Sequence, residues 1–421
     1  MQYRVDVKSG RRLSALGFGC MRFPKGPGDR QKAEDLVMKA VERGINYFDT
    51  AYMYPGNEEA LGAALAKNGV RDRVYIATKL PLVFCRSPED FDRYFNKSLE
   101  RLRTDHVDYY LMHMLTSREA WKKLCSWGIE DWIADKKSSG QMRQLGFSFH
   151  GIQHEFLELL EARDWDFCQI QYNYSDENFQ AGTAGLVRAA ARGLPVIVME
   201  PLLGGKLTGS KAPGALPPEA VEIFKKADPA LSPAAWALRW VWNREEVTCL
   251  LSGMTSPGQV EENAALAEGA LPGIIGAEER KIYAGVLEIF NAFYKIHCTG
   301  CNYCMPCPRG VNIPACFASY NISFSIGWMA GMKQFVTSTT PMLETTGGPG
   351  RCVKCGKCES HCPQHLPVIK NLEQVRKRME PLWYRWSMPV IRTLLGKNPA
   401  PAPPVRRKGR RKTKEQSNGL L

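Results

Sequence analysis

Long apolar runs are missing from this sequence, and none reaches the roughly 20 residues that a membrane-spanning helix needs. The first residues, Met1 to Lys8, also lack the apolar core of a secretory signal peptide. From these two absences we predict a cytoplasmic protein without a membrane span. The composition, 44% hydrophobic and 24% charged, is that of a globular chain that can bury a full core.

The sequence also lacks the disulfide framework of a small secreted protein, although it contains 14 cysteines. Eight of them fall in two tight runs near the C-terminus. Six are scattered through apparent core segments: Cys20, Cys85, Cys125, Cys168, Cys249 and Cys316. A metal or cluster held in a reducing compartment explains the two runs better than disulfides do.

A dinucleotide-binding glycine fingerprint is absent after the first strand-like run, because residues 17–21 do not complete G-x-G-x-x-G. This argues against a doubly wound sheet. Eight strand–helix units in roughly 250 residues instead predict a (β/α)8 TIM barrel. The strand-like runs are 15–21, 45–49, 74–80, 107–113, 142–148, 167–172, 195–200 and 247–252. The helical patterns are 30–43, 57–68, 88–103, 118–138, 152–163, 181–192, 232–243, 257–268 and 278–294.

The chain is expected to contain four parts. These are a barrel at 1–275, a connecting helix at 276–295, an iron–sulfur module at 296–385 and a basic, proline-rich tail at 386–421. The barrel should begin with a hairpin over residues 1–14. The segment Leu207–Leu231, rich in Gly, Pro and Ala, should form a long loop over the mouth of the pocket.

The net charge of +13 is concentrated in the tail, where seven basic residues after position 405 face a single acid, Glu415. With its prolines, this composition predicts disorder. A patch for nucleic acid, anionic lipid or an acidic partner is one interpretation. A solvated tail is the preferred one, since no aromatic residues interleave with the charges, and no nucleic-acid partner is expected.

Three consecutive predicted strands end in an ionisable residue: Asp49, Lys79 and His113. In a parallel barrel these residues reach one rim, and Tyr54 follows in the loop after Asp49. Such a set suits proton delivery to a developing alkoxide. A neighbouring ammonium should lower the pKa of the phenol, and the imidazole should orient a carbonyl oxygen.

The stretch Phe48-Asp49-Thr50-Ala51-x-x-Tyr54, the strand-end Lys79 and the segment 108–113 resemble the aldo/keto reductases. The resemblance covers about residues 10–268. It implies carbonyl or alcohol chemistry with NAD or NADP, in which Tyr54 is the general acid, Asp49 and Lys79 tune it and His113 orients the substrate.

The resemblance also implies a set of nucleotide contacts in the later loops. These are Ser148, Gln169, Gly204, Gly205, Ser252, Gly253, Glu262 and Asn263. The chain departs from the family at Phe149, where Asn is usual, and at Met199, where an aromatic ring is usual. Gly253 and Gln259 replace the cations that often hold a 2′-phosphate, so NADH or weakened nucleotide binding stays open as an alternative to NADPH.

The two cysteine runs match bacterial ferredoxin spacing, C-x2-C-x2-C-x3-C-P, with the first run one residue shorter at its last gap. Three thiolates of a run wrap one cluster, and the fourth, followed by Pro, ligates the other cluster. We therefore assign two [4Fe–4S] clusters. The first takes Cys298, Cys301, Cys304 and Cys362. The second takes Cys352, Cys355, Cys358 and Cys307.

Structural zinc is the alternative, but it usually pairs C-x2-C knuckles across a longer loop and fits these runs poorly. The whole chain further resembles a subgroup of aldo/keto reductases that carry a ferredoxin-like module, of α+β or irregular structure, in which a Cys-Pro run precedes Gly310–Pro314.

Taken together, the sequence predicts an oxidoreductase that reduces a small aldehyde or ketone, or runs the reverse reaction, coupled to electron transfer through its clusters. A redox protein partner is a possible addition. No flavin-specific motif is present to join hydride transfer to one-electron steps. The alternatives are an electron-transfer protein, or a regulatory one whose barrel has lost nucleotide-dependent catalysis.

Overall fold

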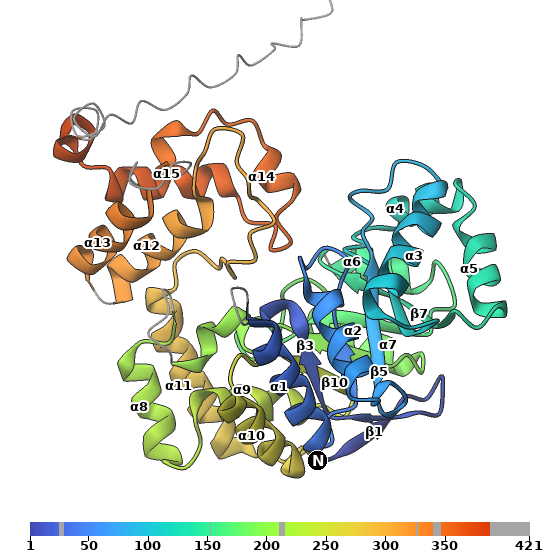
Figure 1. The fold of residues 1–421 in the computed structure, drawn as a ribbon. Coiled ribbons are helices and arrows are strands. Elements are labelled where there is room, and N and C mark those ends of the chain that lie inside the picture. Colours follow the sequence, from blue (N-terminus) through green and yellow to red (C-terminus); the bar gives the residue numbers. More distant parts are fainter. Residues whose placement is uncertain (25–28, 152, 210–214, 326, 340–346, 388–421) are drawn as a thin grey trace, which may run out of the picture.

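The structure is a computed structural model that describes residues 1–24, 29–151, 153–209, 215–325, 327–339 and 347–387. Eight parallel strands form a closed barrel in the order β10-β3-β4-β5-β6-β7-β8-β9 (Figure 1). They are β3 (Leu16–Gly19), β4 (Tyr47–Asp49), β5 (Tyr75–Leu80), β6 (Val107–Met112), β7 (Met142–Phe149), β8 (Phe167–Gln171), β9 (Val196–Met199) and β10 (Val247–Ser252). The predicted TIM barrel is confirmed, strand by strand.

Helices connect the strands and cover the outside of the barrel (Figure 1). They are α1 (Asp29–Glu42), α2 (Asn57–Lys67), α3 (Glu89–Leu102), α4 (Arg118–Cys125), α5 (Ile129–Ser138), α6 (Gln153–Leu160), α7 (Gly182–Ala191), α8 (Pro218–Ala227), α9 (Pro233–Trp242) and α10 (Pro257–Leu266). The apolar stripe of α3, which includes Phe91, Phe95 and Leu99, shows how these helices pack: one face is buried and the other is solvated.

Two segments differ from the prediction. The pattern at 118–138 forms two helices, because Gly128 adopts a left-handed conformation with φ 79° between α4 and α5. The expected loop at 207–231 contains α8, so that prediction was wrong for residues 218–227. Phe224 of α8 stacks on Trp236 with ring centroids 4.9 Å apart, and this burial offsets the cost of ordering the helix.

The N-terminal hairpin of β1 (Tyr3–Val5) and β2 (Arg12–Ser14) closes the end of the barrel where the strands begin. Asp6 is fully buried there and accepts a hydrogen bond of 2.7 Å from the hydroxyl of Tyr109 on β6. Leu13 packs with the inward side chains of the strands. The opposite end, where the strands finish, therefore has to carry any functional pocket.

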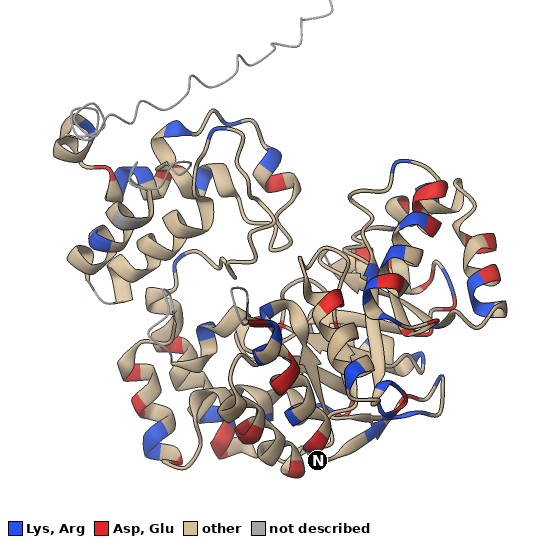
Figure 2. Ribbon diagram, viewed as in Figure 1, with Lys and Arg blue, Asp and Glu red and all other residues tan. Residues whose placement is uncertain are grey.

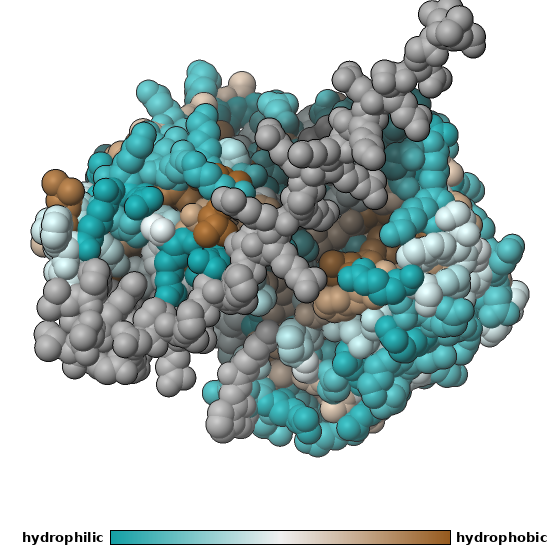
Figure 3. Space-filling view, turned by 90° about the horizontal axis from the view of Figure 1, so that it is seen from above, coloured by the Kyte–Doolittle hydropathy of each residue, from teal (hydrophilic) through white to brown (hydrophobic). Residues whose placement is uncertain are grey.

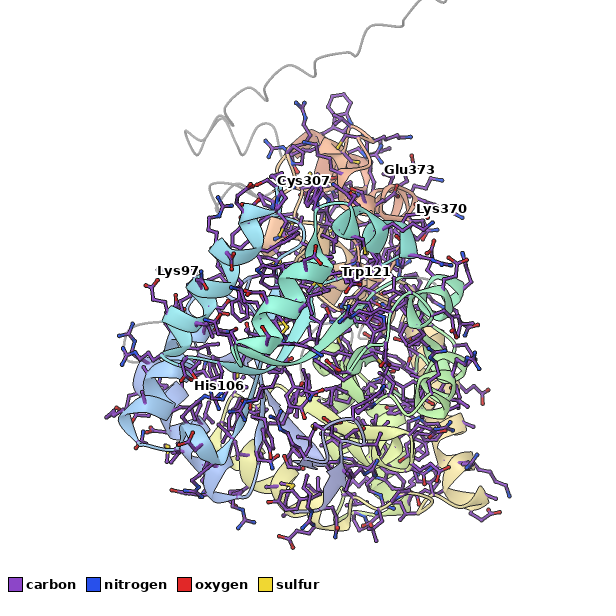
Figure 4. All side chains as sticks on the ribbon, turned by 90° about the vertical axis from the view of Figure 1, so that its right-hand side faces the viewer. Lys97, His106, Trp121, Cys307, Lys370 and Glu373 are labelled. Atoms are coloured by element: carbon purple, nitrogen blue, oxygen red, sulfur yellow. The ribbon has the colours of Figure 1, made fainter. Side chains whose placement is uncertain are left out.

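Helix α11 (Ala277–Phe293) leads from the barrel to a C-terminal module of mainly helical structure (Figure 1). Its helices are α12 (Ile313–Ser325), α13 (Trp328–Thr339), α14 (Lys357–Ser360) and α15 (Val368–Met379). In the described part of the module, β pairing consists of one isolated bridge between Val311 and Gly347. In Figure 4 the labelled Cys307 lies in this module. The labelled His106, directly before β6, lies far from it, at the end of the barrel where the strands begin.

The figures show how charged and apolar residues are distributed over the molecule. Acidic and basic residues are interspersed over the barrel helices in Figure 2, and brown patches lie among teal residues in Figure 3. Within the described ranges, no helix combines the length and the apolar character needed to cross a bilayer. Most of the tail predicted to be disordered, from residue 388 onwards, lies outside the described residues.

Candidate active site and cluster-binding module

The candidate catalytic residues form one layer because of strand register. Inward side chains alternate along a strand, so each candidate follows a buried interior residue by two positions. The pairs are Tyr47 and Asp49, Ala77 and Lys79, Leu111 and His113, and Phe167 and Gln169. Register places Asp49 beside Ala77 and Lys79 beside Leu111. The prediction that these strand ends share one rim is confirmed.

A buried ion pair stands at the centre of this layer. Lys79 Nζ lies 2.6 Å from Asp49 Oδ1 and donates a second hydrogen bond of 2.8 Å to the carbonyl oxygen of Thr50. Gln169 Nε2 donates to the other carboxylate oxygen of Asp49 at 2.8 Å. All the side chains in this set are almost fully buried, so each charge depends on its partner.

Tyr54 faces this pair from the loop after β4. The ammonium of Lys79 lies 5.3 Å from the centre of the Tyr54 ring, and the ring of His113 lies 6.1 Å away at an interplanar angle of 88°. The structure thus brings together all four residues that were predicted from separate strands and a loop.

The electrostatics of Tyr54 and His113 keep both groups in their neutral forms. Burial raises the pKa of Tyr54 well above its ordinary range, and neighbouring Tyr303 and Asp49 add to this. This direction is opposite to the one expected from an ammonium neighbour, because desolvation of the phenol by burial is the larger effect. Burial likewise lowers the pKa of His113 well below its ordinary value, and Lys79 contributes.

The predicted nucleotide contacts lie on strands β7, β8 and β10, in the loops after β9 and β10, and in α10. The hydroxyl oxygen of Ser148 accepts a hydrogen bond of 2.9 Å from the Met114 amide, which leaves its proton free to donate. Asn263 Nδ2 donates to Ser252 Oγ at 3.1 Å, while Glu262 accepts a hydrogen bond from Ser232.

The turn after β9 contains two consecutive glycines with positive φ. Gly204 and Gly205 have φ values of 65° and 92°, a left-handed conformation that glycine adopts without strain. A Cβ added to Gly205 would meet nothing within 4 Å, although the Gly205 amide already donates to the carbonyl oxygen of Leu202 at 2.8 Å. The available hydroxyl proton of Ser148 and the open space at Gly205 are compatible with a bound dinucleotide.

Sequence reasoning missed Arg22, which supplies a cation to these loops. Its Nη2 donates a hydrogen bond of 3.3 Å to the carbonyl oxygen of Gly204, and its side chain packs against Gly253. The signal was its place directly after the first strand, which neighbours β10 in a closed barrel.

Three of the departures from the family pattern have different surroundings. Phe149 is buried between the barrel and α6, with its ring 4.9 Å from Phe156, and so faces away from the pocket. Met199 packs against the interior cluster and faces inward. Gln259 Oε1 accepts a hydrogen bond of 2.7 Å from the Thr255 amide and stabilises its own loop.

The first predicted set of thiols lines one small cavity in the module. Cys298, Cys301, Cys304 and Cys362 surround it together with apolar side chains such as Ile313, Phe317 and Leu366. Burial raises the pKa of both Cys301 and Cys304 to about 12, so these thiols need a bound metal to become thiolates. The cavity's ligand set and apolar wall fit an iron–sulfur cluster.

The second predicted set packs against the same apolar core. Cys307, Cys352 and Cys358 pack against it, and Cys355 is exposed. Burial raises the pKa of Cys358 to about 11, and the negative charge of Glu359 adds to this. Within the described ranges, no three His, Cys, Asp or Glu side chains converge tightly enough to hold a single metal ion.

Two more residues that sequence reasoning missed lie between the module and the barrel. Tyr303, from the first cysteine run, has its hydroxyl 3.5 Å from His113 Nε2 and lies close enough to Tyr54 to raise the pKa of that phenol. Glu200 follows β9, and burial, helped by Asp176, raises its pKa to about 7. The sequence signal available for Tyr303 was an aromatic residue inside a cysteine run. No sequence signal pointed to Glu200.

Comparisons with known proteins match these two parts separately. Residues 15–272 match the aldo/keto reductase family, and residues 297–369 match a 4Fe-4S dicluster domain. The NADH-specific methylglyoxal reductase of Escherichia coli is 27% identical over 60% of this chain and 89% of its own length. Protein tas of the same species is 28% identical, over 62% of this chain and 92% of its length.

Solved structures agree. An aldo-keto reductase from Bacillus halodurans in its holo form is 26% identical and superposes with a TM-score of 0.56. The match covers 68% of this chain and 96% of that one. A Klebsiella pneumoniae aldo/keto reductase in complex with NADP and acetate, 22% identical with a TM-score of 0.54, shares the fold over 68% of this chain and 96% of its own.

Fold and family match together define an NAD(P)-dependent oxidoreductase built on a TIM barrel. The chain belongs to the aldo/keto reductase family and carries a 4Fe-4S dicluster domain after its barrel.

Proposed function

We propose that the barrel reduces a small aldehyde or ketone with NAD(P)H, or runs the reverse oxidation, with Tyr54 as the general acid or base. The observation that carries this proposal is the layer formed by the Asp49–Lys79 pair, 2.6 Å apart, below Tyr54 and His113. Strand register holds Asp49 and Lys79 in place, which suits a preorganised site.

In this proposal each residue acts on one atom of the substrate. The bound nicotinamide supplies the hydride. Tyr54, protonated at neutral pH because burial raises its pKa, donates a proton to the carbonyl oxygen. Neutral His113 fixes the direction of that oxygen by a hydrogen bond from Nε2. Lys79 stabilises the phenolate that Tyr54 becomes, and Asp49 holds Lys79 in place.

Ser148, Gln169, Gly204, Gly205, Ser252, Gly253, Glu262 and Asn263 are proposed to surround the nucleotide. Both NADH and NADPH are retained as hydride donors. Gln259, at a position where a cation often holds the 2′-phosphate, is engaged within its own loop, whereas Arg22 brings a cation to Gly204. The relative named as NADH-specific supports testing NADH first.

For the module at 296–385 we propose two [4Fe–4S] clusters, which supply one-electron transfer, with a redox protein as their partner. One cavity is lined by Cys298, Cys301, Cys304 and Cys362. This supports an arrangement in which the last cysteine of one run ligates the cluster of the other run. The matched dicluster domain supports clusters over zinc.

The test compares Tyr54→Phe with wild type in anaerobically purified protein. We expect carbonyl-dependent NAD(P)H oxidation to fall by about 100-fold or more, while iron and sulfide content stay unchanged. Tyr52→Phe is the matched control, because Tyr52 lies in the same loop but packs on Tyr94 and Arg101. Retained turnover in Tyr54→Phe would overturn the proposed role.

A second candidate function is favoured by Tyr303, whose hydroxyl already engages Tyr54 and lies near His113. A barrel blocked in this way suits an electron-transfer or regulatory protein without carbonyl turnover. Wild-type protein with full clusters and bound NAD(P)H, but no reduction of a panel of aldehydes and ketones, would favour this candidate.

A further inference from the structure

Tyr303 stands where the proposed mechanism needs the substrate oxygen. The mechanism asks Tyr54 to donate a proton to that oxygen and His113 Nε2 to orient it. The hydroxyl of Tyr303 lies next to Tyr54, close enough to affect its pKa, and 3.5 Å from His113 Nε2. The rings of Tyr303 and His113 are 6.5 Å apart, nearly perpendicular. The phenol therefore makes the two contacts that a carbonyl oxygen would make.

Contacts on both sides of the barrel mouth fix this position. Thr299, four residues before Tyr303, places its carbonyl oxygen against Gly204. The hydroxyl of Tyr294 donates to the carbonyl oxygen of Cys298 at 2.9 Å. On the side of the second run, Gln180 Nε2 donates to the carbonyl oxygen of Pro363 at 2.8 Å.

A fourth contact joins His365 Nε2 to the carbonyl oxygen of His150, 2.5 Å apart, directly after β7. The module is thus held on the barrel by its two cysteine runs, and Tyr303 projects from one of them between Cys301 and Cys304. The ring of Tyr303 therefore comes from the cluster-binding loop of the module and not from the barrel.

Resting on the proposed function, we infer that Tyr303 is a specificity-determining residue that competes with the substrate oxygen for Tyr54 and His113. A carbonyl oxygen is a better acceptor than a phenol, so it displaces the Tyr303 hydroxyl, but the ring stays beside it. The site therefore selects slender carbonyl compounds, such as short unbranched aldehydes, over branched or aryl ketones.

The kinetic test separates the hydroxyl of Tyr303 from its ring. Tyr303→Phe removes the competing oxygen, and we expect KM for propanal to fall about fivefold, the value of one hydrogen bond, with kcat within about twofold. Tyr303→Ala removes the ring, and we expect the ratio of kcat/KM for acetophenone to that for propanal to rise about tenfold or more.

Tyr320→Phe is the matched control, because Tyr320 lies in α12 of the same module and packs on Phe324. It should leave both kinetic constants unchanged. Each variant is compared at equal iron content. If Tyr303→Phe loses iron, Tyr303→Met keeps an apolar side chain of similar length and carries the same expectation.

A binding measurement works without turnover. Acetate, titrated by calorimetry into protein saturated with oxidised nucleotide, mimics the substrate oxygen, and Tyr303→Phe should bind it about fivefold more tightly than wild type. This result in a protein that reduces no carbonyl would support the inference and overturn the proposed reduction. Turnover with unchanged KM and unchanged acetate affinity in Tyr303→Phe would overturn the inference alone. A kcat lowered 100-fold at unchanged KM would also overturn it, because Tyr303 would then serve proton transfer.

Discussion

The carbonyl oxygen of Thr299 lies 2.6 Å from the point where a Cβ on Gly204 would stand, so only glycine lets the module approach the barrel this closely. This contact joins the first cysteine run to the turn proposed for the nucleotide phosphates. It makes the docking of the two domains sensitive to a single methyl group.

We therefore expect Gly204→Ala to loosen the module. Because Gly204 has φ 65°, part of the effect is backbone strain of roughly 1 kcal/mol. Gly205→Ala carries similar strain at φ 92° but meets nothing within 4 Å, so it isolates the clash. Hydrogen exchange over residues 296–379 should rise in Gly204→Ala and not in Gly205→Ala. Equal exchange in both would contradict the contact.

The buried pair of Asp49 and Lys79 should behave as a unit. Asp49→Asn or Lys79→Met alone leaves one uncompensated charge in the core, and we expect each to lower the free energy of unfolding by about 3 to 5 kcal/mol. The double variant should lose less than the sum of the two, by about 2 kcal/mol or more. Urea unfolding followed by tryptophan fluorescence measures this, and additive losses would show that the pair is not coupled.

The pH dependence of carbonyl reduction should report Glu200. Burial raises its pKa to about 7, so it is neutral below that pH and ionised above it. Its negative charge raises the pKa of Tyr54, which makes the phenol a weaker acid. We therefore expect kcat/KM for reduction to fall severalfold as pH rises through about 7.

Other groups should not obscure this step, because the pKa of His113 is far below its ordinary value and that of Tyr54 far above. Glu200→Gln should give a flat profile between pH 6 and pH 9. Glu278→Gln, on the exposed side of α11, is the control and should keep the inflection. An inflection that persists in Glu200→Gln would assign it to another group.

The assignment of the last cysteine of each run to the other run's cluster can be tested one cysteine at a time. Cys362→Ser should destroy the cluster of the first run, although Cys362 belongs to the second run, and leave about half of the iron. Cys307→Ser should destroy the other cluster. Cys125→Ser changes an exposed barrel cysteine and should leave iron unchanged. Electron paramagnetic resonance of the reduced protein identifies which cluster remains.

The sequence by itself determined the barrel, its strand ends and the cysteine runs, because each depends on local pattern. Short apolar runs separated by helical patterns indicated the strands, and the ionisable residues at the ends of three consecutive runs, Asp49, Lys79 and His113, located the rim. The helix at 218–227 was missed because a stretch rich in Gly, Pro and Ala hid an apolar stripe that only α11 and Trp236 make stable.

Only the tertiary structure decided how the module meets the barrel. Nothing in the spacing of Cys301 and Cys304 indicates that Tyr303 reaches Tyr54, because that contact joins residues almost 250 positions apart. The direction of the pKa shift at Tyr54 was decided in the same way. An ammonium neighbour alone would lower that pKa, but the covering module buries the phenol, and desolvation is the larger effect.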